Sequence, residues 1–133
     1  MNFEPVGCNE KGELYMRFHK PFTVVEKIQL LQRSILVDSF CYYELNENLK
    51  PDYMYDNNAK QLAELKKQYP VEFKRSRYHG YFHDYCTDEE NAHYTSGFDL
   101  LERVRKTNKD LYRRLWMDAA NALHLKQMRG AGV

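Results

Sequence analysis

Apolar residues recur at helical spacing over most of the chain, and the first two helices are the clearest. One follows Thr23 and Glu26, which have the spacing of a capping box, and it ends near Tyr43. The other follows Asp52, which suits an N-cap, and stops at Pro70. Inward positions are Val24, Ile28, Leu31 and Ile35 in the first helix, and Tyr55, Ala59, Leu62, Leu65 and Tyr69 in the second.

Three further helices are predicted where a hydroxyl residue is followed three positions later by an acidic one. These pairs are Thr87 with Glu90, Ser96 with Asp99, and Thr107 with Asp110. In the last helix, Leu111, Leu115 and Ala122 are expected to face the core. The aromatic segment 71–86, which precedes these helices, is expected to be irregular.

The N-terminal segment shows a different period. After a turn signal at residues 9–12, apolar Leu14, Met16 and Phe18 alternate with more polar neighbours, which is typical of a half-buried strand. The sequence therefore predicts a mainly α fold with a small N-terminal β-hairpin. Residues 1–22 form the hairpin, residues 23–128 form a single helical domain, and residues 129–133 form a frayed tail.

Composition places the chain among soluble globular proteins. Its 133 residues are 43% hydrophobic and 29% charged, which is enough for one domain with its own core. No apolar run approaches the ~20 residues that cross a bilayer, and the first ten residues lack the pattern of a signal peptide. Three widely separated cysteines are not typical of a disulfide framework. We expect a cytoplasmic protein without a membrane partner.

Charge is concentrated at one end of the chain. The net charge is +1, yet residues 101–133 hold eight Lys or Arg against three Asp or Glu. Tyr112 and Trp116 lie among these cations, a combination compatible with phosphate contacts and base stacking. Residues 101–133 are therefore a candidate surface for nucleic acid or for an acidic protein. The alternative is a solvated amphipathic helix with Trp116 in the core.

Five residues form the main candidate binding site. Asp52, Tyr55 and Asp56 have i, i+3, i+4 spacing and project from one side of a helical turn, while Tyr42 and Tyr43 end the preceding helix. A short connection brings the two groups together in a cleft with carboxylates and phenol rings. Such a cleft suits a flat cation, because rings stack on it and carboxylates neutralise its charge. Each residue also has a structural interpretation, as cap, core residue or favourable charge in a first turn.

This pattern resembles the N-terminal helical subdomain, Ia, of bacterial NAD-dependent DNA ligases. The resemblance covers residues 23–70 and runs without a gap from Tyr42 to Pro70. In that family the subdomain holds the nicotinamide mononucleotide (NMN) half of NAD with residues of these types at this spacing. The resemblance implies that Tyr42 and Tyr55 pack around the nicotinamide, and that Asp52 and Asp56 meet the positive ring, its amide or its ribose. Tyr43 stands where the family often has His.

The Lys-x-Asp-Gly motif that supplies the family's adenylated lysine occurs nowhere in the sequence. The chain looks like small ligase-related proteins carried by bacteriophages, in which the cofactor subdomain stands alone. The resemblance therefore implies a non-catalytic accessory protein in a bacterial host cell that acts by binding. Its partner would be a host or defence protein, or a nicotinamide nucleotide such as NMN or NAD, with no cofactor required. The alternatives are a split-ligase subunit or a small nucleotide hydrolase.

A second cluster combines aromatic side chains with possible metal ligands. His79, His83, Cys86 and His93 are residue types that bind zinc, although their spacing matches no established metal motif. The aromatic residues either complete the core under a long loop or form a protein interface of the amphipathic kind. For an interface, the expected anchors are Tyr78, Tyr81, His83 and Tyr85, with Arg113 and Arg114 on the basic helix.

Overall fold

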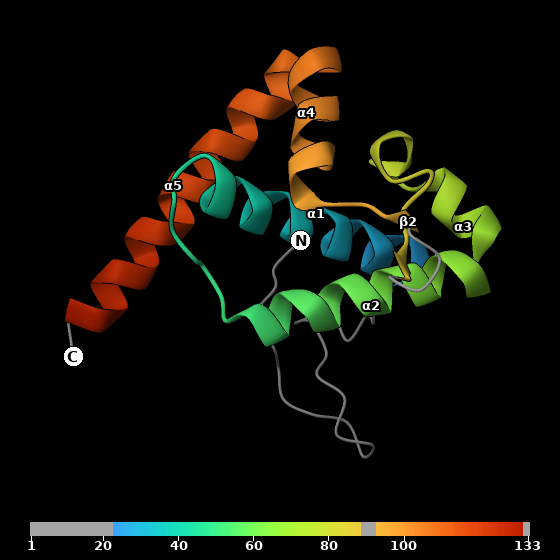
Figure 1. Ribbon diagram of the computed structural model, residues 1–133, viewed down its shortest axis with the longest axis horizontal. Helices are drawn as coiled ribbons and strands as arrows, with labels where there is room; N and C mark the ends of the chain where they lie inside the picture. The colour runs from blue at the N-terminus through green and yellow to red at the C-terminus, as the bar shows by residue number, and fades with distance from the viewer. Residues whose placement is uncertain (1–22, 89–92, 132–133) are drawn as a thin grey trace.

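A computed structural model describes residues 23–88 and 93–131, and these residues are mainly helical (Figure 1). The long helices are α1 (Val24–Tyr43), α2 (Asp52–Gln68), α4 (Gly97–Thr107) and α5 (Lys109–Ala131). A short helix α3 (Pro70–Arg75) and a 3-10 turn η1 (His79–Tyr81) connect α2 to a minimal antiparallel ladder of β1 (Thr87–Asp88) and β2 (His93–Tyr94). The β-hairpin predicted for residues 1–22 lies outside the described residues.

Helix α1 is the centre of the fold, because it packs against α2, α3, α4 and α5. Helices α1 and α2 form an antiparallel pair, while α4 and α5 lean together over the other side of α1 (Figure 1). One apolar core runs from Ile28 in α1 to Leu123 in α5. Helix α1 is buried on much of its circumference, as expected for a helix with neighbours on several sides.

Two of the predicted capping signals are confirmed. The side chain of Thr23 accepts a hydrogen bond from the Glu26 N–H (3.2 Å), and Glu26 Oε1 accepts one from the Thr23 N–H (3.0 Å), which completes a capping box. The Ser96 hydroxyl likewise accepts from the Asp99 N–H (3.1 Å) at the start of α4. These caps satisfy backbone donors that the first helical turn leaves without a partner. The predicted end of the first helix at Tyr43 is also confirmed.

Other predicted helix boundaries differ from the structure by one or a few residues, and one segment that was expected to be irregular contains a helix. Pro51 is the N-cap of α2, so Asp52 is the first helical residue and caps nothing with its side chain. Asn108, and not Thr107, makes the capping hydrogen bond before α5, because its Oδ1 accepts from the Leu111 N–H (3.0 Å). Helix α5 continues to Ala131, past the predicted end at residue 128. Residues 71–86 were expected to be irregular, but they contain most of α3. Pro70 suits the first position of that helix, because the N–H that proline lacks would have no partner within the helix there.

The helix predicted after Thr87 is wrong, since Thr87 pairs with Tyr94 and Asp88 with His93 in the ladder. No apolar stripe follows Thr87, so a helix there would have no face to bury.

The predicted core positions of α5 are confirmed for Leu111 and Leu115, which are buried, and wrong for Ala122, which is only half-buried. Ala119 and Leu123 continue the buried face in its place. Trp116 is 53% exposed, so its predicted alternative place in the core is wrong. A four-residue step brings each buried side chain of α5 onto one narrow stripe, and Trp116 lies beside that stripe. No helix within the described residues is long and apolar enough to cross a membrane.

Candidate functional site

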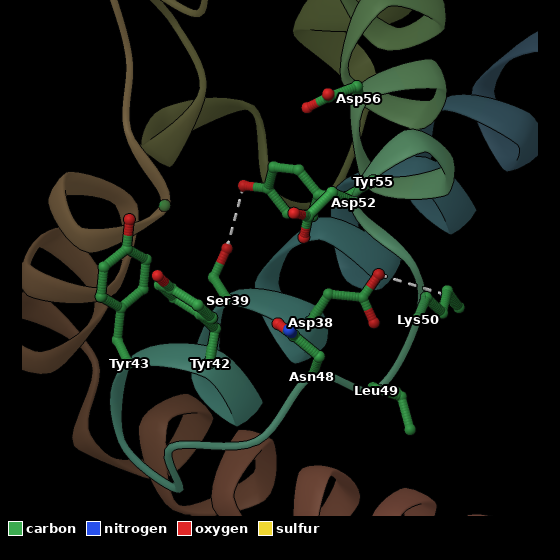
Figure 2. A pocket seen from close by; sticks show the side chains of 11 residues that line it. Asp38, Ser39, Tyr42, Tyr43, Asn48, Leu49, Lys50, Asp52, Tyr55 and Asp56 are labelled. Atoms are coloured by element: carbon green, nitrogen blue, oxygen red, sulfur yellow. Dashed lines mark hydrogen bonds and ion pairs between the residues drawn. The ribbon is translucent and has the colours of Figure 1, made fainter.

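All five residues of the predicted cleft line one cavity of about 230 Å³. It lies where the end of α1, the connection of residues 44–51 and the start of α2 meet, with the first residue of α4, Gly97, at its wall. Figure 2 shows Tyr42 and Tyr43 on one side and the α2 residues across from them. The cleft residues are Tyr42, Tyr43, Asp52, Tyr55 and Asp56, joined by Asp38, Ser39, Asn48, Leu49, Lys50 and Gly97.

The two tyrosines form the aromatic side of the cleft. Their rings meet edge to face, with centroids 4.8 Å apart and planes at 90°. Tyr43 also contacts the ring of Phe98 from α4, at 5.8 Å. Tyr42 is 54% exposed. The two rings and Phe98 therefore form an aromatic wall on which a flat ligand can stack.

The first turn of α2 forms the opposite side. Asp52, Tyr55 and Asp56 project together, as their spacing predicts (Figure 2). The Tyr55 and Ser39 hydroxyl oxygens lie 3.2 Å apart in a hydrogen bond that ties α2 to α1. Gly97 closes the floor, since a Cβ there would lie 2.9 Å from the Ser39 Cβ and 3.1 Å from the Tyr55 hydroxyl. Only a glycine allows the start of α4 to approach this closely.

The charges of the cleft are mainly negative. Asp52 and Asp56 are exposed, and no cation among the described residues pairs with either carboxylate. Asp38 is buried and accepts a hydrogen bond from Lys50 Nζ to its Oδ2 (3.2 Å), while Lys50 also donates to the Ser34 hydroxyl (2.8 Å). Burial raises the pKa of Asp38, and Lys50 opposes that rise. Lys50, the only cation among the described residues that line the cleft, is therefore already engaged by α1.

Helix α5 also touches the cleft. Lys126 Nζ donates a hydrogen bond to the backbone oxygen of Asn48, at 2.6 Å. This bond joins α5 to the connection of residues 44–51, which forms one wall of the cleft. Within the same connection Asn46 has a φ of 55°, a conformation that Asn adopts more readily than most residues.

The sequence interpretation missed Asp38, Ser39, Lys50 and Gly97 as site residues. Asp38 and Ser39 precede Tyr42 and Tyr43 by four positions, so their place on the same face of α1 was readable from the spacing. Lys50 and Gly97 carried no local signal, because their positions depend on how the connection and α4 fold back onto α1.

Two of the predicted interface anchors are core residues. Tyr78 is 6% exposed and Tyr85 is 4% exposed, and the Tyr78 hydroxyl accepts a hydrogen bond from Arg33 Nη1 (3.0 Å). Tyr81 is half-buried, and its hydroxyl accepts from Asn108 Nδ2 (3.3 Å). The prediction of a tyrosine-rich surface is therefore wrong for Tyr78 and Tyr85, because the segment from α3 to Tyr85 packs onto the core.

The remaining predicted partner residues, His83, Arg113 and Arg114, are exposed. His83 Nδ1 lies 3.0 Å from the backbone oxygen of Gly80, within its own turn.

The possible zinc ligands do not meet in the described part of the chain. His79 and His83 are exposed near η1, and Cys86 is half-buried. Within the described residues, no group of three or more His, Cys, Asp or Glu side chains is placed to hold a metal ion. The His93 side chain lies outside the described set.

Comparison with known proteins adds no relative to this picture. Neither the models of known protein families, nor the curated proteins, nor the solved structures contain a match to this chain.

Proposed function

We propose that this chain is a binding protein whose cleft holds the N-substituted nicotinamide ring of a nicotinamide nucleoside or nucleotide. The observation that carries the proposal is the convergence of Tyr42, Tyr55, Asp52 and Asp56, from two different helices, around one cavity. A resemblance between separated positions in a sequence could arise by chance. Their meeting in one cleft is what a binding role requires.

The chemistry of the cleft favours a flat cation over a neutral ring. Phenol faces stack on a pyridinium, and two carboxylates that pair with no cation in the described part of the chain lower the energy of its positive charge. At an assumed separation of about 5 Å and a water-like dielectric, each carboxylate contributes about 0.8 kcal/mol, or roughly fourfold in affinity. Loss of both should therefore weaken binding by roughly tenfold or more.

The same charges select among nicotinamide compounds. A mononucleotide carries a phosphate, and Lys50, the one cation among the described residues that line the cleft, is already bound by Asp38 and Ser34. The ring end of the nucleotide fits these residues, whereas the phosphate finds no uncommitted cation among the described lining residues. We therefore propose that a cationic riboside binds better than NMN or NAD.

Direct titration tests the proposal. Calorimetry or ligand-observed NMR should show binding of nicotinamide riboside and 1-methylnicotinamide, weaker binding of NMN, and little binding of neutral nicotinamide. Asp52→Asn and Asp56→Asn should each weaken riboside binding, whereas Asp110→Asn should not. Asp110 is the matched control, because it occupies the first turn of α5 and does not line the cleft.

Two results would contradict this function. One is no binding of any of the four compounds at millimolar concentration. The other is equal affinity for neutral nicotinamide and its cationic derivatives, which would leave the carboxylates without a role. Incubation with NAD, followed by analysis for released nicotinamide, tests the hydrolase alternative separately.

The interface with a host or defence protein loses part of its basis in this structure. Tyr78 and Tyr85, two of its expected aromatic anchors, are buried in the core and are not presented to a partner.

A further inference from the structure

A groove unrelated to the cleft lies at the junction of α4 and α5, where the two helices lean together (Figure 1). It has a volume of about 410 Å³ and is lined by Arg105, Lys109, Tyr112, Arg113 and Trp116. The last four share one face of α5, at i, i+3, i+4 and i+7, and Arg105 faces them from the end of α4.

The groove is positively charged. Arg105 is paired with Glu102, at 2.7 Å, but Lys109 and Arg113 are exposed and have no acidic partner among the described residues. The surrounding segment, residues 101–133, has a net charge of +5 from eight basic and three acidic residues. This local excess stands against a net charge of only +1 for the whole chain.

The exposed indole is not explained by packing. Helix α5 fills the core with Leu111, Leu115, Ala119 and Leu123, and Trp116 contributes no buried ring to that stripe. Tyr112 differs, because its ring packs on Phe40 with centroids 5.1 Å apart. Among the described residues that line the groove, Trp116 is therefore the one ring that is more than half exposed, at 53%, and it lies beside two cations that no described acidic residue pairs with.

We propose that this groove binds single-stranded nucleic acid. Lys109 and Arg113 contact backbone phosphates, and an unstacked base lies on Trp116. Cations that follow a phosphate backbone next to an aromatic platform are the usual means of binding single strands without sequence preference. A duplex fits less well, because its bases remain stacked on each other and cannot reach the indole. An acidic protein would use the cations and leave the ring unexplained.

The chain contains one tryptophan, so its fluorescence reports directly on this groove. Titration with an oligothymidine of ten nucleotides at 50 mM salt should quench Trp116 saturably. If Lys109 and Arg113 each engage a phosphate, a plot of log affinity against log salt concentration should have a slope of about −1.4, which is about a sevenfold loss of affinity between 50 and 200 mM. Heparin and polyglutamate serve as anions without bases and should bind with little quenching.

Variants separate the contribution of base stacking from that of the phosphate contacts. Their affinities are measured by the fluorescence anisotropy of a labelled oligothymidine. Trp116→Leu should weaken binding at least fivefold, which corresponds to about 1 kcal/mol of stacking. Lys109→Glu with Arg113→Glu should abolish it at 200 mM salt. The matched control is Lys74→Glu with Arg75→Glu, two exposed cations at the end of α3. Circular dichroism confirms that each variant folds, as expected for exposed positions.

Three outcomes would overturn the proposal. The first is no oligothymidine binding at 50 mM salt by a folded protein. The second is unchanged affinity in Trp116→Leu with equal binding of heparin, which would reduce the groove to a general polyanion surface. The third is tighter binding of polyglutamate than of oligothymidine, which would indicate an acidic protein partner. Asp52→Asn should leave the result unchanged, so the two proposed functions fail independently.

Discussion

Replacement of Gly97 by alanine should damage the fold and the cleft together. The added Cβ would lie 2.9 Å from the Ser39 Cβ and 3.1 Å from the Tyr55 hydroxyl, and real Cβ atoms do not approach a neighbouring carbon that closely. Overpacking of this kind costs about 1–3 kcal/mol, which exceeds the benefit of alanine over glycine within a helix. Because the Cβ would meet two side chains at once, we take the upper end of this range, about 3 kcal/mol, and subtract about 1 kcal/mol for helix propensity, which leaves a net loss of about 2 kcal/mol.

Thermal unfolding followed by circular dichroism measures this loss. For a chain of this length, about 2 kcal/mol lowers the Tm by roughly 8 °C. Gly80→Ala is the matched control, because a Cβ at Gly80 meets no atom within 4 Å. Its Tm should stay near that of the wild type. The Gly97→Ala variant should also bind nicotinamide riboside less tightly, because Tyr55 must move.

A double-mutant cycle identifies the cause. Ser39→Gly removes the Oγ and the Cβ of Ser39, both of which the new Cβ would meet, although it also removes the hydrogen bond to Tyr55. Ser39→Gly with Gly97→Ala should therefore lose about 1 kcal/mol less than the sum of the two single variants. Strict additivity, or a Gly97→Ala protein with the wild-type Tm, would show that α4 does not approach α1 as closely as described.

Three further predictions concern buried groups. Burial raises the pKa of Asp38, so its native carboxyl binds protons more readily than in the unfolded chain, and its contribution to stability falls as pH rises above about 4. We therefore expect the free energy of unfolding of Asp38→Asn, measured in urea, to rise relative to that of the wild type between pH 4 and pH 7. A difference that does not change with pH would contradict a raised pKa of Asp38. Tyr78→Ala should lower the free energy of unfolding by about 3–5 kcal/mol, because it removes a buried ring. Tyr78→Phe should lower it by only about 1–2 kcal/mol, because it removes only the hydrogen bond with Arg33. Equal stability of the two variants would contradict the burial of Tyr78. Burial raises the pKa of Cys41 to about 11, so iodoacetamide at pH 8 should label it only after denaturation, as peptide mass spectrometry can check.

The part of the cleft that was predictable from sequence is the part encoded by helical spacing. Asp52, Tyr55 and Asp56 share a face because of the 3.6-residue period, and that holds wherever the helix packs. The short connection then restricts how far the Tyr42–Tyr43 end of α1 can lie from it. Local spacing and chain length were sufficient for both inferences.

The remainder depends on contacts between distant segments. Tyr78 and Tyr85 have the composition of an exposed binding loop, and only the packing of residues 70–85 onto the core buries them. Trp116 shows the reverse case, since a lone tryptophan in an amphipathic helix is usually core, yet here smaller residues fill the stripe. Amphipathic aromatic residues are ambiguous in sequence because either environment satisfies them.

The hydrogen bond from Lys126 to the Asn48 backbone bears on how the protein can be handled. It joins the last turns of α5 to the loop that forms one wall of the cleft, so the region around Lys126 is not a neutral attachment point. A tag or fluorophore that bends those turns would pull on the cleft wall. Affinity handles and fluorophores for ligand measurements therefore belong elsewhere, for example on an exposed residue of α3 such as Lys74.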